Sequence, residues 1–478
     1  MAFNFLTADR GQLILMPPSL ADWLPEDHLV WFVLDVVTEL DLSVFLAGYR
    51  PDGRGGAAYD PAMMVALLVY AYSVGERSSR RIERRCVEDV AFRVIAVNQA
   101  PDHATIARFR ATHERALAGL FAQVLALCAR AGVLRPGLVA IDGTKLAANA
   151  SRDANRTAEQ LAAEILAEAA ATDAAEDEQA RVVGEAELPE GLRRRSGRRE
   201  RLRGLLEELQ AEAEEKSYEA QMARRAEIEQ ATGRPVRGRR PSLHAATHRS
   251  RRQANTTDPD SRLLKTKGGY IQGYNAQAVT TEDQFVIAAE VTNNAHDAPS
   301  FEPMIAATKE NLRRAGGQKR IRRVVADAGY WSEDNANLAG VETFIAPGRT
   351  RNLGRIAEQD NERSELLARI EAGEVDKNDA AGALGVTRTR VNQLLRLRRR
   401  GDPTTLTTAM MARLDTPQGR CIYKKRAASI EPVFGQIKHN RRIDSLSRRG
   451  TSAADSEWKL ITATHNLLKL WRLAMTTA

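Results

Sequence analysis

Three acidic residues stand at points of the sequence where they could take part in chemistry. Asp142 follows the apolar run Leu138–Ile141, Asp327 follows Arg323–Ala326, and Glu431 lies at the start of an apolar helical segment. Transfer of a phosphodiester needs charge neutralised on the attacking oxygen, the leaving oxygen and the phosphate, and two divalent ions about 3.5 to 4 Å apart can do this. Because Mg²⁺ prefers oxygen ligands, a few carboxylates suffice to hold it, so the three acids predict metal-dependent phosphoryl transfer.

Each acid also has an ordinary structural explanation. Asp142 with Gly143 could form a turn, and Asp327 could cap the end of a strand. Glu431 could cap the start of a helix before Pro432. These alternatives stay open for any one acid taken alone, but the three positions together favour one site.

The segments that must position the acids alternate between strand and helix patterns. The expected strands are 138–141, 274–280, 285–291, 323–326 and 342–346, and the expected helices are 301–315 and the one that carries Glu431. The second and third strands have hairpin spacing. The order strand, strand, strand, helix, strand, strand, helix, with acids at the first strand, the fourth strand and the last helix, predicts an α/β fold with a ribonuclease H-like mixed-sheet core.

The segment around Glu431 has a clear helical pattern. One face is apolar and is expected to pack in the core; it consists of Ile430, Val433, Phe434 and Ile437. At about 100° per residue, an adjacent face carries Glu431, Gly435 and Lys438. A carboxylate, a residue without a side chain and an ammonium on one face would let a phosphate backbone approach closely.

The N-terminal part of the chain shows helical spacing of apolar residues to about Leu134. It contains a basic cluster, followed by Asp102, which could cap a helix that exposes Arg108 and Arg110. This pattern predicts a DNA-contacting unit. A solvated basic face on a helical bundle is an equally open explanation.

A second DNA-reading element is expected between residues 379 and 395. Asp379 could cap a short helix, Gly385 could form a tight turn, and Thr387 could cap a second helix. That second helix would expose Arg388 and Arg390 and bury its apolar residues. The alternative is an ordinary helical hairpin that covers the core.

The expected organisation interrupts the core twice. The expected segments are an all-α N-terminal DNA-binding domain (1–134), the first part of the core (135–154), a charged helical insertion (155–255), the second part of the core (256–348), a helical insertion with the helix-turn-helix-like segment (349–415), and the C-terminal catalytic helix with further helices (416–478).

Two other groups of potential metal ligands are given structural interpretations. Cys86, Cys128 and Cys421 are widely spaced without a CxxC pair, so they are expected to be small buried residues. His296 and Asp297 are expected to lie in a solvated loop after a strand.

The composition fits a folded protein with a polyanionic partner. Of the 478 residues, 43% are hydrophobic, which excludes disorder throughout, and the net charge is +8. The longest apolar run, Ala62–Val74, is shorter than the roughly 20 residues that span a bilayer, and no signal-type segment opens the chain. We therefore expect a cytoplasmic protein without a membrane partner.

Several motifs resemble one known family. Val139–Lys145, Val324–Tyr330 and Glu431–Lys438 are similar to the motifs of the DDE transposases of bacterial insertion sequences, and the stretch from Tyr59 to Arg110 is similar as well. The likeness also includes Asp258–Asp260, Lys265–Asn275 and Glu290–Asn294. It spans most of the chain outside the two expected insertions.

The resemblance implies roles for single residues. Asp142, Asp327 and Glu431 would be the catalytic and metal-binding triad, with Asp142 bridging two Mg²⁺ ions, or Mn²⁺ in their place. A tyrosine, arginine, glutamate, lysine signature falls on Tyr423, Arg426, Glu431 and Lys438, whose three other members would contact DNA. Four residues separate Arg426 from Glu431, whereas three are usual in relatives.

The resemblance also implies an activity and its partners. A transposase cuts the ends of its element and then joins the released 3′-hydroxyl to target DNA. Its partners would be double-stranded DNA, as terminal inverted repeats and target, in a homodimer or larger complex at the bacterial nucleoid. Two alternatives remain: a nuclease of the same fold without strand transfer, and a DNA-binding relic or repressor without turnover, against which the presence of all three acids argues.

Overall fold

The computed structural model describes residues 19–49, 58–157, 160, 167, 222, 253–266, 268–316, 320–348, 362–399 and 406–477. The chain forms two compact units. One comprises Met1–Val133, Gln436–Ile443 and Lys459–Ala478, and the other comprises Leu134–Gly435 and Asp444–Trp458. Most of the insertion expected at 155–255 lies outside the described residues, and the finer domain boundaries stay predictions.

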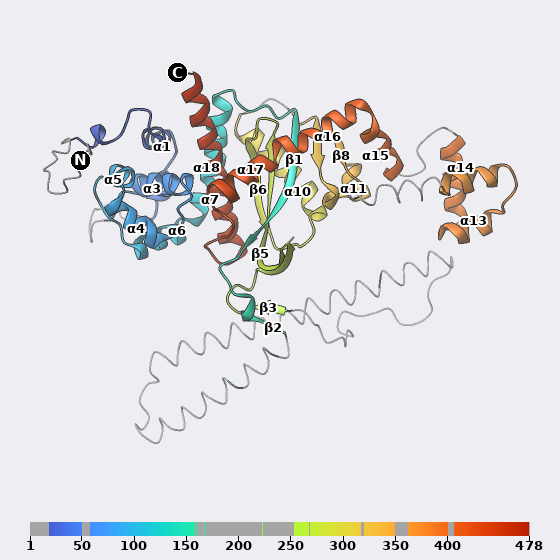
Figure 1. Cartoon of the computed structure of the whole chain (residues 1–478), viewed down its shortest axis with the longest axis horizontal. Coiled ribbons are helices and arrows are strands. Elements are labelled where there is room, and N and C mark those ends of the chain that lie inside the picture. The colour runs from blue at the N-terminus through green and yellow to red at the C-terminus, as the bar shows by residue number, and fades with distance from the viewer. Residues whose placement is uncertain are drawn as a thin grey trace, which may run out of the picture. The chain divides into compact units, whose positions relative to one another are not determined.

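The second unit is built on a mixed sheet (Figure 1). Its strands are β1 (Leu138–Ala147), β4 (Arg262–Thr266), β5 (Gly269–Thr281), β6 (Val286–Thr292), β7 (Arg323–Ala326) and β8 (Glu342–Ile345). The spatial order β6-β5-β1-β7-β8 is antiparallel from β6 to β1 and parallel from β1 to β8, with β4 paired to the first part of β5. This arrangement confirms the expected α/β class with a ribonuclease H-like core.

The strand β1 is longer than its apolar run. Leu138–Ile141 is buried, as is typical of strands covered on both faces, and it pairs with β7 as far as Ile141. Beyond that point β1 continues to pair with β5 as far as Ala147. The expectation that the strand ends at Asp142 is therefore wrong, because the partner on its other side extends the ladder.

Helices cover this sheet. α10 (Phe301–Arg314) packs against β5 and β6, and α16 (Pro417–Ser429) packs against β1, β7 and β8. α17 (Glu431–Gly435) follows α16 directly, and α18 (Thr451–Thr477) begins in this unit. The indole of Trp458 is fully buried and donates a hydrogen bond to the backbone oxygen of Gln277, 2.9 Å away, which ties α18 to β5.

The first unit confirms the expected helices of the N-terminal segment. Its longer helices are α1 (Leu29–Thr38), α3 (Pro61–Ser73), α4 (Ser79–Glu88), α5 (Val90–Ile95), α6 (His103–Thr112) and α7 (Glu114–Arg130). Asp102 accepts a hydrogen bond from the Thr105 N–H and so caps α6 as expected. Cys86 and Cys128 are buried as expected, whereas Cys421 in the other unit is exposed. A helix long and apolar enough to cross a membrane does not occur in the described ranges.

A small helical module lies within residues 362–399. It contains a helix at 362–371, then α13 (Lys377–Leu384) and α14 (Arg388–Arg399). Asp376 caps α13 by accepting a hydrogen bond from the Asn378 N–H, 2.7 Å away. The expectation that Asp379 is the cap is wrong because the helix begins earlier, so Asp379 lies in its first turn.

Gly273 lies where β1 and β5 approach closely, and we expect that replacing it with Ala will destabilise the second unit. A Cβ atom at this position would be 2.1 Å from the Leu146 backbone oxygen, which cannot move without breaking the ladder. Overpacking against backbone should cost at least about 2 kcal/mol of unfolding free energy. Gly137→Ala is the control, because a Cβ atom there meets nothing within 4 Å. Equal urea midpoints for the two variants would contradict the expected clash.

Candidate active site

Asp142 and Asp327 lie at the same level of two neighbouring parallel strands. Ile141 of β1 pairs with Ala326 of β7; Asp142 is the next residue of β1, and Asp327 directly follows the end of β7. Neighbouring strands are about 4.8 Å apart, so the register brings the two carboxylates together. Asp142 lies inside β1 and not in a turn. Asp327 does cap the short helix η5 (Ala328–Tyr330), since its side chain accepts a hydrogen bond from the Gly329 N–H.

The nearby carboxylate of Asp327 affects the pKa of Asp142. Burial and, next, the negative charge of Asp327 raise this pKa to about 7. The Gly143 N–H, 2.8 Å from Asp142 Oδ1, and the Arg426 guanidinium oppose this shift. Two carboxylates that repel each other in a half-buried position favour a cation nearby.

Arg426 supplies that positive charge in this structure. Its Nη1 donates to Asp142 Oδ2 at 3.3 Å, and its Nη2 donates to Glu431 Oε1 at 3.0 Å. One guanidinium therefore links the first and third acids, although they are far apart in the sequence. The side chains of Asp142 and Arg426 are each only 19% exposed, so solvent screens this pair weakly.

A break between α16 and α17 accounts for the spacing from Arg426 to Glu431. α16 ends at Ser429, Ile430 forms the junction, and α17 begins with Glu431. The additional residue between Arg426 and Glu431 therefore falls where the helix is interrupted, and the two side chains still meet. Tyr423 lies one turn before Arg426. Burial raises the pKa of its hydroxyl, and the negative charges of Asp327 and Asp142 raise this pKa further.

The amphipathic pattern of the Glu431 segment is largely confirmed. Ile430, Val433 and Ile437 are completely buried, while Glu431 and Gly435 are exposed. Phe434 is only half-buried, and its ring lies 6.4 Å from that of Trp458. The apolar face thus anchors the segment and leaves the carboxylate of Glu431 directed away from the core.

Asp297 is a further acid beside this pair. It lies in the loop after β6, as expected, but its side chain is only 23% exposed and is not simply solvated. Its Oδ1 accepts hydrogen bonds from the side-chain amides of Asn275 at 2.7 Å and Gln277 at 3.0 Å. The Lys145 ammonium lies 3.6 Å from the same oxygen. His296 is exposed, as expected for a loop. Asn275 and Gln277 lie two apart on β5, and this alternation of polar residues on one strand face was the signal that could have indicated the network.

The polar network continues beneath the acids. The hydroxyl of Tyr330, which is fully buried, donates a hydrogen bond to Gln277 Oε1. A Cβ atom at Gly143 would come within 2.3 Å of Gln277 Nε2 and 2.8 Å of Asp297 Oδ1, so only glycine leaves room for these contacts. A Cβ atom at Gly329 would lie 3.0 Å from both Asp297 Oδ2 and Asp327 Oδ1, which places those two carboxylates next to each other.

The other expected site residues lie outside this group. Lys438 is in the π-helix η6 (Gln436–Asn440), which belongs to the first unit. Arg108 is exposed on α6, and Arg388 and Arg390 are exposed on α14. Their contacts with DNA stay predictions.

The expectation that Arg110 is exposed is wrong. This residue is only 8% exposed, and its guanidinium donates to the Tyr72 hydroxyl, the Arg77 backbone oxygen and the Ser79 hydroxyl. Arg110 follows Phe109, which is also buried, and the helix turns both towards the core. With its donors directed inward, Arg110 holds α6 against the start of α4.

The chemistry of the donor set suits divalent cations. Asp142 and Asp327 offer carboxylate oxygens side by side, and Arg426 between Asp142 and Glu431 shows that a positive charge is stabilised there. In the described part of the chain, no three His, Cys, Asp or Glu side chains are grouped closely enough to hold a metal ion. Asp142, Asp327 and Glu431 could hold one only after the Arg426 side chain turns away.

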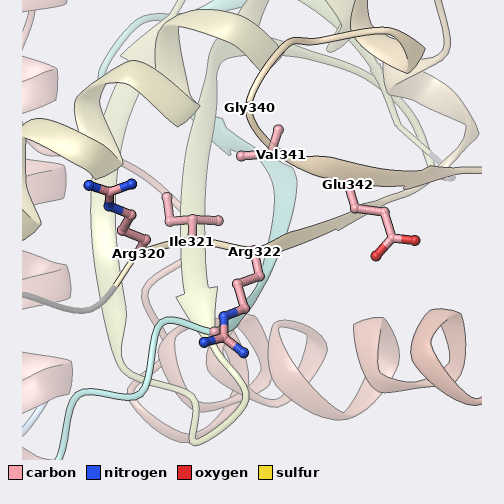
Figure 2. A pocket seen from close by; sticks show the side chains of 7 residues that line it. Arg320, Ile321, Arg322, Gly340, Val341 and Glu342 are labelled. Atoms are coloured by element: carbon pink, nitrogen blue, oxygen red, sulfur yellow. The ribbon is translucent and has the colours of Figure 1, made fainter.

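The open cavity shown in Figure 2 is not part of this site. It is lined by Gly137, Arg320–Arg322 and Gly340–Glu342. These residues precede or begin β1, β7 and β8, so the cavity lies at the opposite end of the parallel strands from the acids.

Replacing Asp142 with Asn should stabilise the metal-free chain near pH 8 and have little effect near pH 4. An unfolded aspartate ionises near pH 4, whereas the folded Asp142 keeps its proton to about pH 7. The unfolding free energy therefore falls as the pH rises from about 4 to about 7. Once the pH is above 7, the total decrease should be about 2–4 kcal/mol. Urea midpoints in the presence of a chelator measure this difference, with the exposed Asp334→Asn as control. No gain for D142N near pH 8 would contradict the raised pKa.

Two models of known protein families match this chain. The model described as Transposase domain (DUF772) matches residues 18–112, and the model described as Transposase DDE domain matches residues 237–467. Searches of curated proteins and of solved structures gave no match. The second range includes Asp327 and Glu431 but begins after Asp142, which β1 places beside Asp327 and Arg426 links to Glu431. The two matches together cover more than half of the sequence, and the chain belongs to the DDE transposases of insertion sequences.

Proposed function

We propose that this transposase cleaves DNA at the ends of its element and transfers the released strands into target DNA, with Asp142, Asp327 and Glu431 as its catalytic residues. The observation that carries the proposal is that Asp142 and Asp327 each follow the last residue pair of the parallel strands β1 and β7, with Arg426 linking Asp142 to Glu431. Three acids from distant parts of the sequence are thereby brought to one edge of the core.

The proposed reaction consists of two displacements at phosphorus. In the first, a water oxygen attacks the phosphorus at the element end and the bond to the 3′-oxygen breaks; the water loses a proton and the leaving 3′-oxygen takes one up, so that a 3′-hydroxyl and a 5′-phosphate result. In the second, that 3′-hydroxyl attacks a target phosphodiester and loses its proton, and the target's own 3′-oxygen leaves and takes one up. Each step forms one phosphorus–oxygen bond and breaks one.

The side chains around the acids have separate roles in this proposal. Two divalent cations, Mg²⁺ or Mn²⁺, would neutralise charge on the attacking oxygen, the leaving oxygen and the phosphate. Asp142 must be ionised to hold a cation, and a pKa of about 7 means that a large share of it is protonated at neutral pH in the metal-free chain. Arg426 would release Asp142 and Glu431 and bind a DNA phosphate, because its guanidinium suits both anions.

DNA contacts outside the acids complete the proposal. Tyr423 precedes Arg426 on α16, and we assign both to the DNA backbone near the cleaved bond; Lys438, in the first unit, would bind a DNA phosphate separately. Arg108, exposed on α6, would contact the terminal repeats. Such phosphate contacts give affinity rather than sequence preference. Joining two ends of one element needs two active sites, so we propose a homodimer or larger complex on DNA.

Replacing Asp142, Asp327 or Glu431 with Ala should each lower the Mg²⁺-dependent cleavage rate by at least about 1,000-fold, because each removes a ligand of the charge-neutralising cations. Binding to element-end DNA should stay within a few-fold of wild type. The substrate is a duplex made from the DNA that flanks the coding sequence. Gel-resolved cleavage and electrophoretic mobility shift measure the two effects.

The matched control is Glu342→Ala. This acid begins β8 at the other end of the parallel strands and pairs with Arg323 at the surface. It should cleave like wild type. Full activity in any of the three alanine variants would remove that residue from the site.

Strand transfer is tested with pre-cut element ends and a supercoiled plasmid. A transposase should join the 3′-hydroxyl of the cut end to the plasmid and give nicked and linear products that carry the labelled end. Ends that lack the 3′-hydroxyl are the control, since they have no nucleophile. Cleavage of uncut ends without any joined product would favour the nuclease of the same fold, and binding without cleavage would favour a relic.

A further inference from the structure

The helical module at residues 362–399 is built around its own apolar core. This core consists of Leu367, Ile370, Ala380, Ala381, Val391, Leu394 and Leu395, with Leu366, Val375 and Val386 packed against it. All of these residues lie between 366 and 395, in the module's own helices and the turns between them. The apolar face of α14 is therefore used inside the module. A helical hairpin that served to cover the sheet would instead direct this face towards the sheet.

The turn between α13 and α14 has the geometry of a helix-turn-helix. Gly385 adopts a left-handed conformation with φ 63°, which favours glycine, and the Val386 N–H donates to the Ala381 backbone oxygen at 3.0 Å. Thr387 then caps α14 by accepting a hydrogen bond from the Arg390 N–H. Three residues thus connect the two helices, as is usual for this motif.

An ion pair holds α14 against the first helix of the module. The Arg398 guanidinium donates to the backbone oxygen and the hydroxyl of Ser364, each 2.6 Å away, and its Nε lies 3.3 Å from a carboxylate oxygen of Glu371. Arg398 is on the same face as the buried Val391 and Leu394. This contact therefore sets which face of α14 turns outward.

The outward face of α14 carries side chains of types that can recognise bases. Thr389, Gln393 and Arg396 are exposed and lie three or four residues apart, so they form one stripe opposite the buried face. Arg388 and Arg390 flank this stripe near the start of the helix, and Arg390 Nη1 lies 3.2 Å from Gln393 Oε1. Arginine reads guanine and glutamine reads adenine in the major groove through paired hydrogen bonds.

Charge is distributed unevenly over the module. All of its acidic residues precede Gly385, whereas the segment 386–399 contains five arginines and no acid. A helix with this charge attracts the phosphates that line a groove of duplex DNA, while the acidic helices are repelled by them. The distribution favours an approach in which α14 faces the DNA and the other two helices face away.

We propose that residues 362–399 form a sequence-reading DNA-binding element in which α14 enters the major groove of duplex DNA. It would act in addition to the N-terminal helices. The proposal rests on the family's action on DNA but not on the assignment of the three acids, so a test of binding can fail or succeed independently of a test of cleavage.

The experiment selects bound sequences from a pool of randomised duplexes with the full-length chain. Asp327→Ala is present in every protein, so that no DNA is cut during selection. The starting protein should enrich a motif, and adding Thr389→Ala with Gln393→Ala should remove the preference at a small set of adjacent positions. Affinity for the enriched duplex should fall about 10- to 100-fold, as expected for losing base-specific contacts. Affinity for an unrelated duplex should change little.

The matched control is Arg369→Ala, which removes an exposed arginine from the first helix of the same module together with its ion pair to Glu374. It should leave the enriched motif unchanged. Because Thr389 and Gln393 are exposed, their replacement should not unfold the module, and circular dichroism of the full chain checks this.

Two results would overturn the proposal. One is an identical motif and affinity in the folded T389A/Q393A protein, which would leave sequence reading to other parts of the chain. The other is enrichment of single-stranded RNA over duplex DNA through these residues in a parallel selection. Conversely, a motif that changes as expected supports the proposal even if Asp142, Asp327 and Glu431 prove not to be the catalytic residues.

Discussion

The repulsion between Asp142 and Asp327 is the constraint on which the site depends. Burial and the neighbouring carboxylate hold the pKa of Asp142 near 7, so the fold pays a cost to keep the two acids together. Natural proteins accept such local costs mainly at functional positions. Arg426 offsets part of the cost in the metal-free chain by linking Asp142 to Glu431, and bound cations would offset it in the same place.

The surroundings of the two acids follow from this constraint. Adjacent strands in exact register bring the carboxylates together, and Gly143 leaves room for the amides and the carboxylate that pack behind Asp142. Asp297 is itself held by two amides and an ammonium, so its charge is compensated by groups other than the site's own arginine. The side-chain amides of Asn275 and Gln277 and the Tyr330 hydroxyl donate hydrogen bonds in the polar layer beneath the acids, which helps to fix the strands, whereas Asn275 Oδ1 is buried without a partner among the described residues.

Local sequence patterns predicted most strands of the core, and the features that they missed depend on tertiary contacts. Apolar runs of strand length and the hairpin spacing after residue 280 predicted the order of these strands along the chain, because such signals lie within a few residues. The extension of β1 beyond Asp142 depends on β5, which lies more than a hundred residues later. Likewise, Arg110 looked like an exposed arginine in a basic helix, but its partners Tyr72 and Ser79 belong to other helices. Pairing across the fold is not visible in the periodicity of one segment.

The first expected insertion separates Asp142 from the other acids in sequence without separating them in space. The strands β2 (Asn155–Thr157) and β3 (Gln253–Asn255) pair in antiparallel fashion, so the chain leaves and returns to the core at one point. The buried side-chain amide of Asn255 donates to Asn155 Oδ1 and to the Ser151 backbone oxygen, and its Oδ1 accepts from the N–H groups of Thr257 and Asp258. Because the entropy cost of closing a loop grows only slowly with its length, a long segment between β2 and β3 adds little to the cost of this closure. The family match that begins at residue 237 covers β5 and β7, the two strands with which β1 and its Asp142 pair.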